Sequence, residues 1–187
     1  FVNHKGEVVI KPQFDDALSF KDGLAVVKQN DKYGFIDKTG KLVIQPQFVM
    51  VRPFNNGIAV FKDGNTDSWG CMDKEGKIIF KPQYERAFEF NEGLARIEQN
   101  NRYGFINEKG EVVIKPQYED FIFDYVSEGY TYTSLAFHSG LACVKSGDVF
   151  GYINKAGEMA IQPQFDYVTS FYNDIAFVVK DEQWGVI

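Results

Sequence analysis

The chain has 187 residues, 44% of them hydrophobic and 25% charged, so it can bury a core without disulfides or a structural metal. Its formal net charge of −6 disfavours binding to nucleic acid or an anionic membrane surface, and no apolar run approaches the roughly 18 residues of a membrane span. Two cysteines exclude a disulfide scaffold and two histidines leave little for metal binding, while 18 Phe and 10 Tyr indicate a soluble β protein.

Short strands joined by tight turns are predicted in chain order from Gly23. Residues 24–28 and 33–36 form two strands, separated by a polar turn at 29–32. Residues 37–40 place Asp first and Gly fourth, a pattern typical of a type I turn followed by a left-handed glycine. Residues 42–44 form a third strand, which Pro46 should end because proline has no N–H to donate, and 48–54 form a short fourth segment.

Three segments of this pattern return in register along the chain. The run Gly-x-x-x-Ile-x-Pro-Gln-aromatic occurs in five copies, at 6–14, 40–48, 76–84, 110–118 and 157–165, with Phe in place of Ile in the third. An aromatic-Gly pair recurs at Tyr33, Trp69, Tyr103, Phe150 and Trp184. A Gly-Leu-Ala series opens at Gly23, Gly57, Gly93 and Gly140, with Asp174 replacing Gly in the last copy. The steps of that series are 34, 36, 47 and 34 residues, so the unit has about 34 residues and the third step carries an insertion.

The repeats predict an all-β fold of tandem antiparallel β-meanders, about five units in one repeat domain spanning 1–187. The units divide at about residues 23, 57, 93, 140 and 174. The strands are apolar on both faces, as in 24–27, so each unit should be packed between its neighbours. We expect one continuous curved array. A small closed five-bladed, propeller-like ring is the alternative, since the two end pieces together make one further unit.

The aromatic-Gly pair, the Pro-Gln-aromatic run and Gly-Leu-Ala together resemble the WG repeat, or KWG repeat, of bacterial tandem β-repeat proteins. The resemblance covers the chain outside residues 121–137. Phe150, Asp174 and Val49 depart from the residues that their positions favour. The resemblance implies a β-repeat binding scaffold with no catalytic residues to transfer, and the family's frequent setting in bacterial surface and conflict proteins implies an immunity- or adaptor-like role.

Most of the conspicuous residues recur at one position of the repeat, so we expect them to have structural roles and not catalytic or ligand-binding ones. Trp69 and Trp184 hold a position that is aromatic in every unit, which favours packing over ligand stacking. Cys71 and Cys143 replace apolar strand residues and should be buried thiols. A recurring carboxylate follows the Gln-aromatic pair and should be solvated or cap a turn; its copies are Asp15, Glu85, Glu119 and Asp166. We therefore expect no enzyme, no metal and no cofactor.

The insertion at 121–137 is the candidate for partner recognition. It is rich in aromatic residues, and no Lys or Arg lies between Lys115 and Lys145. Insertions in repeat proteins often mark the binding face, and an acidic, aromatic loop suits a basic protein partner. The predicted partner-binding residues are Phe123, Asp124, Tyr125, Glu128, Tyr130 and Tyr132. The structural alternative is an extended hairpin whose aromatic residues pack on the array.

A non-catalytic protein-binding repeat scaffold is thus the predicted function. A cell-surface glycan-binding module is the alternative, and it would need exposed aromatic rings lining a groove. An enzyme would need convergent polar groups in a concave site, and the sequence offers no such set.

Overall fold

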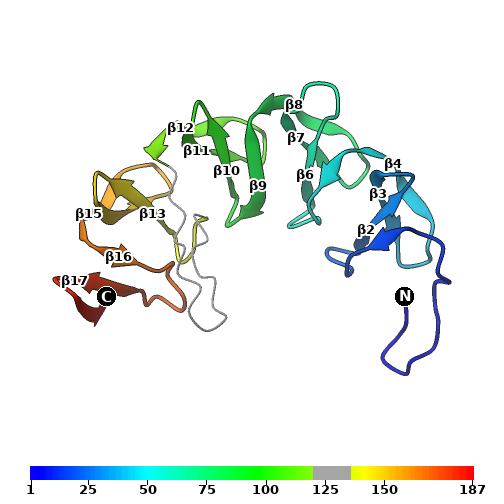
Figure 1. Ribbon diagram of the computed structural model, residues 1–187, viewed down its shortest axis with the longest axis horizontal. Helices are drawn as coiled ribbons and strands as arrows, with labels where there is room; N and C mark the ends of the chain where they lie inside the picture. Colours follow the sequence, from blue (N-terminus) through cyan, green and yellow to red (C-terminus); the bar gives the residue numbers. More distant parts are fainter. Residues whose placement is uncertain (120–135) are drawn as a thin grey trace. The chain divides into compact units, whose positions relative to one another are not determined.

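A computed structural model describes residues 1–119 and 136–187 of the chain. Within these ranges it contains 18 strands in five antiparallel sheets and no helix (Figure 1). The prediction of an all-β fold built from tandem β-meanders is confirmed. The chain separates into two compact units, Phe1–Glu89 and Phe90–Ile187, and each is described by itself.

Each sheet follows the chain without crossovers. The first contains β1 (Asp16–Ala17), β2 (Leu24–Gln29), β3 (Lys32–Asp37) and β4 (Leu42–Phe48). The second contains β5 (Met50–Val51), β6 (Ile58–Lys62), β7 (Trp69–Asp73) and β8 (Ile78–Tyr84). The third contains β9 (Arg86–Asn91), β10 (Leu94–Gln99), β11 (Arg102–Asn107) and β12 (Val112–Glu119). The fourth contains β13 (Leu141–Ser146), β14 (Val149–Asn154) and β15 (Met159–Phe165), and the fifth β16 (Tyr167–Val168), β17 (Phe177–Lys180) and β18 (Gln183–Val186).

The tight turns have the backbone geometry that the sequence indicates. Asn30 and Asp31 join β2 to β3 with φ of 51° and 59°, the two positive values of a type I′ hairpin. In the turn that follows β3, the Oδ1 atom of Asp37 accepts the N–H groups of Thr39 and Lys41, and Gly40 has φ of 87°. The same arrangement recurs at Asp73, Asn107 and Asn154.

The prediction that Pro46 ends its strand is wrong. β4 continues through Pro46 to Phe48, and its pairing with β3 shifts between Tyr33 and Phe35. A bulge places Pro46 where no N–H is required, so the ladder resumes beyond it. Gly34 makes the bulge feasible, because a Cβ atom there would lie 2.5 Å from the carbonyl oxygen of Ile44.

Both faces of the central strands are buried, as predicted. On β2, Val26 belongs to a core cluster that extends to Phe54, Phe61 and Met72 of the second sheet. The adjacent Ala25 and Val27 belong to a separate cluster on the opposite face, with Ile10 and Ile36. A third cluster lies wholly within unit 2, from Leu94 to Val178. Within each unit, successive sheets therefore pack face to face through aliphatic and aromatic side chains.

A further repeated residue, three positions before the Gly-Leu-Ala motif, was missed by the sequence analysis. Phe54, Phe90, Phe137 and Phe171 are buried at this position in successive units. Phe137 is the last residue of the segment 121–137, and its ring packs edge-on against Phe105 with centroids 4.8 Å apart. The Phe-x-x-Gly spacing was present in the sequence and could have revealed it.

Candidate functional site

The six predicted partner-binding residues, Phe123, Asp124, Tyr125, Glu128, Tyr130 and Tyr132, lie outside the described residues. The structure does describe the residues that flank them. Before the gap, Glu119 at the end of β12 forms an ion pair with Arg102 at 3.2 Å. After the gap, Phe137 is 0% exposed in the core of unit 2. The segment between them is thus attached to ordered structure at both ends.

The aromatic-Gly residues are core residues in three of the five repeats. Trp69, Tyr103 and Phe150 are buried, and Tyr33 is half-buried. The prediction is wrong for Trp184, which is 68% exposed. Trp69 is paired with Tyr84 of the adjacent strand β8, whereas β18 is the outermost strand of its sheet. The Trp184 ring meets Tyr167 edge-on at 5.7 Å.

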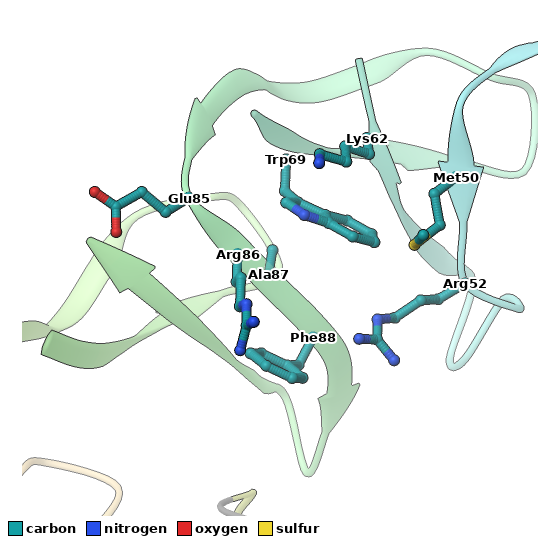
Figure 2. Close-up of a pocket in the computed structure, with 8 residues that line it drawn as sticks. All are labelled: Met50, Arg52, Lys62, Trp69, Glu85, Arg86, Ala87 and Phe88. Atoms are coloured by element: carbon teal, nitrogen blue, oxygen red, sulfur yellow. The ribbon is translucent and has the colours of Figure 1, made fainter. Parts of the chain in front are cut away.

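The hollow around Trp69, here called the Trp69 hollow, encloses about 320 Å³ in unit 1 (Figure 2). Apolar and cationic side chains and one carboxylate line it, from β5, β6, β7, β9 and the residues that follow β5 and β8. They are Met50, Arg52, Lys62, Trp69, Glu85, Arg86, Ala87 and Phe88. Figure 2 shows Glu85 directed away from the centre, while Arg52 reaches toward Phe88 beside the Trp69 ring. The hollow thus combines an aromatic wall with positive charge.

Arg52 is the cation best placed in the Trp69 hollow. Its guanidinium carbon lies 5.5 Å from the centre of the Trp69 ring and 5.0 Å from that of Phe88. Its Nη1 atom is 3.7 Å from a carboxylate oxygen of Glu89, beyond hydrogen-bond distance. Its Nε atom is buried and meets no hydrogen-bond acceptor in the part of the chain that the structure describes. The guanidinium thus lies close to two aromatic rings, and its Nε donor has no acceptor among the described residues.

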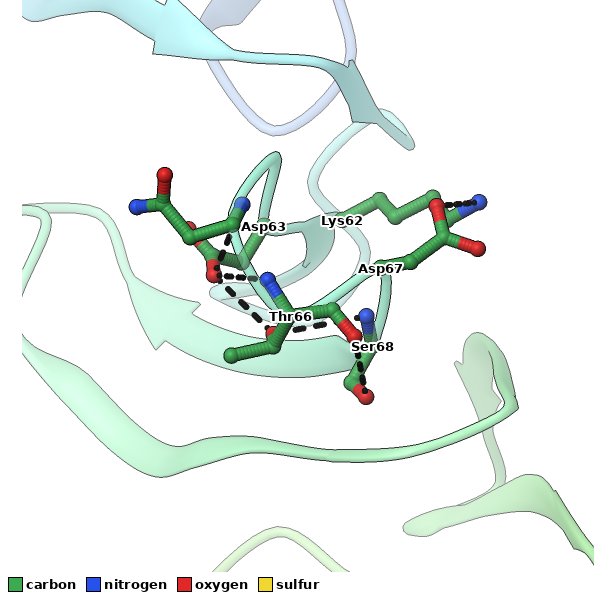
Figure 3. Close-up of polar contacts among 6 residues, drawn as sticks. Lys62, Asp63, Thr66, Asp67 and Ser68 are labelled. Atoms are coloured by element: carbon green, nitrogen blue, oxygen red, sulfur yellow. Dashed lines mark hydrogen bonds and ion pairs between the residues drawn. The ribbon is translucent and has the colours of Figure 1, made fainter.

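Lys62 is held by the loop between β6 and β7. Its ammonium lies 2.6 Å from a carboxylate oxygen of Asp67 (Figure 3). The loop is stabilised by Asp63, whose Oδ2 atom accepts the N–H groups of Asn65 and Thr66 and the hydroxyl of Thr66. The Thr66 hydroxyl and backbone donors hold the pKa of Asp63 below its ordinary value. This loop accounts for the 36-residue step. Six residues separate Lys62 from its partner Trp69, whereas four separate the equivalent partners Lys28 and Tyr33.

The recurring carboxylates cap turns where the structure gives their hydrogen bonds. An oxygen of Asp15 accepts the N–H of Asn30 at 2.9 Å, and Asp166 accepts that of Asp181 at 2.8 Å. Glu119 is ion-paired with Arg102 and Glu85 lines the Trp69 hollow. The turn-capping prediction is confirmed for the two aspartates.

The two thiols are buried, as predicted. Burial raises the pKa of Cys71 to about 12, and burial also raises the pKa of Cys143. His138 lies 3.4 Å from the amide nitrogen of Asn91. In residues 1–119 and 136–187, no three His, Cys, Asp or Glu side chains gather as a metal site would require, and no helix is long and apolar enough to cross a membrane.

Repeated meanders of three or four strands with shared cores define a tandem β-repeat protein. The family model described as "WG containing repeat" matches residues 1–33, 33–66, 69–103, 103–135 and 150–184. The chain belongs to this family, and the resemblance seen in the sequence is confirmed. No curated protein matches the chain.

Solved structures with similar architecture share little sequence with the chain. A crystal structure of a eukaryotic initiation factor has a TM-score of 0.53 at 11% identity, covering 95% of this chain and 52% of that one. KlHsv2 with loop 6CD replaced by a Gly-Ser linker has a TM-score of 0.45 at 9% identity, covering 84% and 56%. Kluyveromyces lactis Hsv2 has 0.37 at 9% identity, covering 88% and 70%. The chain spans about half the length of the first two proteins, and the first of these similarities is one of fold alone.

Proposed function

We propose that the chain is a non-catalytic, protein-binding repeat scaffold that recognises its partner through the insertion at 121–137. The observation that carries the proposal is the attachment of this insertion to rigid structure. Glu119 on one side is ion-paired with Arg102 at the end of a strand pair, and Phe137 on the other side is fully buried. A recognition segment with fixed ends loses less conformational freedom on binding than one at a free terminus.

The charge of the segment favours a basic partner. Between Lys115 and Lys145 the chain contains no Lys or Arg but has Glu119, Asp120, Asp124 and Glu128. Such a stretch would speed association with a basic surface, and salt would weaken the effect. The WG repeats would act as the supporting frame, and the immunity- or adaptor-like role is the form that family resemblance favours.

Deleting residues 122–134 tests this proposal. The deletion removes 13 residues and restores the six-residue step from the Gln-aromatic position to the core Phe that Phe48 and Phe54 show. Full-length chain, the deletion variant and a variant with 13 Gly-Ser residues in this place are compared by affinity capture and salt-dependent binding of the captured partner. We expect both variants to remain folded and to lose at least tenfold in affinity.

Retained partner affinity in both variants would overturn the proposal and place recognition on the repeat surface. Loss of cooperative unfolding in the Gly-Ser variant would show instead that the segment is part of the core. A Lys41→Gln variant serves as control, because it removes one exposed positive charge without altering the segment or the residues that attach it.

Glycan binding is the second candidate, and the exposure of Trp184 favours it. Its indole is exposed beside Tyr167, and flat exposed rings stack on sugar faces. If this function holds, Trp184→Ala should abolish binding on a glycan array without lowering thermal stability, while Trp69→Ala should act only through folding. Absence of glycan binding by the full chain would exclude this candidate.

A further inference from the structure

We propose that the Trp69 hollow binds an extended acidic segment of a partner protein, with a carboxylate on Arg52 and a neighbouring apolar side chain against Trp69, Phe88 and Met50. The site is built entirely from residues of unit 1. None of its lining residues belongs to the insertion, so the proposal does not depend on how that insertion functions.

Arg52 departs from the repeat. It lies two residues before the buried Phe54, and the corresponding residues in other units are Leu18, Phe88 and Thr169. Packing of the repeat therefore does not require a cation at this position. The Arg52 side chain is 34% exposed, but its Nε atom is buried without an acceptor among the described residues, a cost that a bound anion would offset.

The geometry of Arg52 suits a carboxylate. The rings of Trp69 and Phe88 lie 5.5 and 5.0 Å from its guanidinium carbon, which limits rotation of the group. Its Nε atom has no acceptor within the described ranges, and its nearest anionic oxygen, on Glu89, is 3.7 Å from Nη1. A planar guanidinium presents its donors as a fork that matches the two oxygens of a carboxylate.

The other charged side chains of the hollow also favour an anionic ligand. Lys62 is already paired with Asp67 at 2.6 Å, so it adds little net charge but keeps the β6–β7 loop beside the hollow. Arg86 is a second, exposed cation in the lining. Glu85 is the acidic residue in the lining, and it points away from the centre in Figure 2. The carboxylate nearest to an anion on Arg52 would therefore be that of Glu89, which is 3.7 Å from Nη1 and beyond hydrogen-bond distance.

The apolar part of the hollow indicates a peptide rather than a small anion. Met50 is 48% exposed although it is a large apolar side chain, and it flanks the hollow on β5. A volume of about 320 Å³ accommodates one or two side chains. β5 is the outermost strand of its sheet, and an extended segment beside it would direct alternate side chains into the hollow. Alternating acidic and apolar residues fit this pattern.

Fluorescence of Trp69 offers a direct test in a Trp184→Phe background, where it is the single tryptophan of the chain. The probe is a capped hexapeptide of alternating Glu and Phe, and its matched control is the same peptide with Gln in place of Glu. We expect saturable quenching by the Glu peptide and at least tenfold weaker binding of the Gln peptide. Arg52→Gln should lose at least tenfold in affinity, and Arg52→Lys should lie between, since it keeps the charge but not the fork.

Arg102→Gln is the matched protein control, because it removes the same charge from an exposed ion pair outside the hollow. Its affinity for the Glu peptide should stay within twofold of the parent. Equal binding of the Glu and Gln peptides, unchanged binding by Arg52→Gln, or an equal loss in Arg102→Gln would each overturn the proposal. The comparison of the two peptides uses the parent chain, so it remains decisive if an Arg52 variant fails to fold.

Discussion

Trp69 and Trp184 occupy the same position of the repeat, directly before the strand glycine, yet their indoles are 6% and 68% exposed. Trp69 pairs with Tyr84 on β8, while Trp184 lies on the outermost strand β18. A side chain's energetic role is therefore set by the strand that lies beside it. The two residues form a natural pair for measuring what this aromatic position contributes.

We predict that Trp69→Ala lowers the free energy of unfolding by about 3–5 kcal/mol, the range typical of large-to-small substitutions in a core. Trp184→Ala should cost under about 1 kcal/mol, because most of that indole is already in water. Urea unfolding followed by far-UV circular dichroism measures both. Similar losses in the two variants would contradict the assignment of Trp69 to the core.

At the scale of the element, each β-bulge depends on the glycine that follows the repeated aromatic residue. In the first, third and fourth sheets, a Cβ atom on Gly34, Gly104 or Gly151 would collide with the backbone before the proline of the adjacent strand. Gly185 differs, since a Cβ atom there would meet only a methyl group of Val178 at 3.5 Å. Glycine thus allows the proline-containing strand to pair at close distance with the strand beside it.

Gly34→Ala should consequently lower the free energy of unfolding by about 1–3 kcal/mol, since backbone atoms must shift to accept the methyl group. Gly185→Ala is the matched control and should change the unfolding free energy by under about 1 kcal/mol. Thermal unfolding of the two variants measures both changes in stability. An unchanged transition for Gly34→Ala would show that the bulge relaxes without cost.

Neighbouring repeats are also joined by a carboxylate one residue before the Gly-Leu-Ala motif. An oxygen of Glu92 accepts the N–H of Gly140 at 2.9 Å and lies 3.1 Å from the ammonium of Lys155. Asp22 accepts the N–H of Gly57 at 2.7 Å in the same way. Partial burial alone would raise the pKa of Glu92, but the Gly140 N–H and Lys155 outweigh it and hold that pKa below 4.5.

This shift predicts the direction of a pH effect. Because the pKa of Glu92 is lower in the folded than in the unfolded state, its stabilisation is complete above pH 4.5 and is lost as the pH falls through the folded-state value. The contribution should be under about 1 kcal/mol, since both side chains of the pair are partly exposed to water. Glu92→Gln should therefore flatten the acid limb of a stability–pH curve. A curve as steep as that of the parent would assign the effect to other carboxylates.

At the scale of the whole molecule, each of the three core clusters described above lies within one unit. The clusters around Val26 and around Val27 are contained in residues 1–89, and the cluster from Leu94 to Val178 is contained in residues 90–187. Such a molecule gains its stability from packing between consecutive sheets, as in other repeat proteins.

We predict that the complete chain, insertion included, has under about a tenth of its residues in helix, because no 11-residue window holds an unbroken apolar stripe of helical period. The far-UV circular dichroism spectrum should show a β-type minimum without the paired helical bands. Helical bands that vanish on deleting residues 122–134 would locate helix in the insertion and contradict the prediction.

The sequence by itself determined the repeat, the turns and the all-β fold. These features follow from local chemistry: Asp37 caps its own turn, Gly40 accepts a positive φ, and apolar residues on both faces of 24–27 require packed neighbours. Only the tertiary structure decided the rest. The exposure of Trp184, the bulge at Pro46 and the meeting of Arg52 with Trp69 and Phe88 depend on which strand lies beside which. Repeat spacing specifies equivalent positions, but the neighbours that bury a ring or leave a guanidinium without an acceptor are set by packing between sheets.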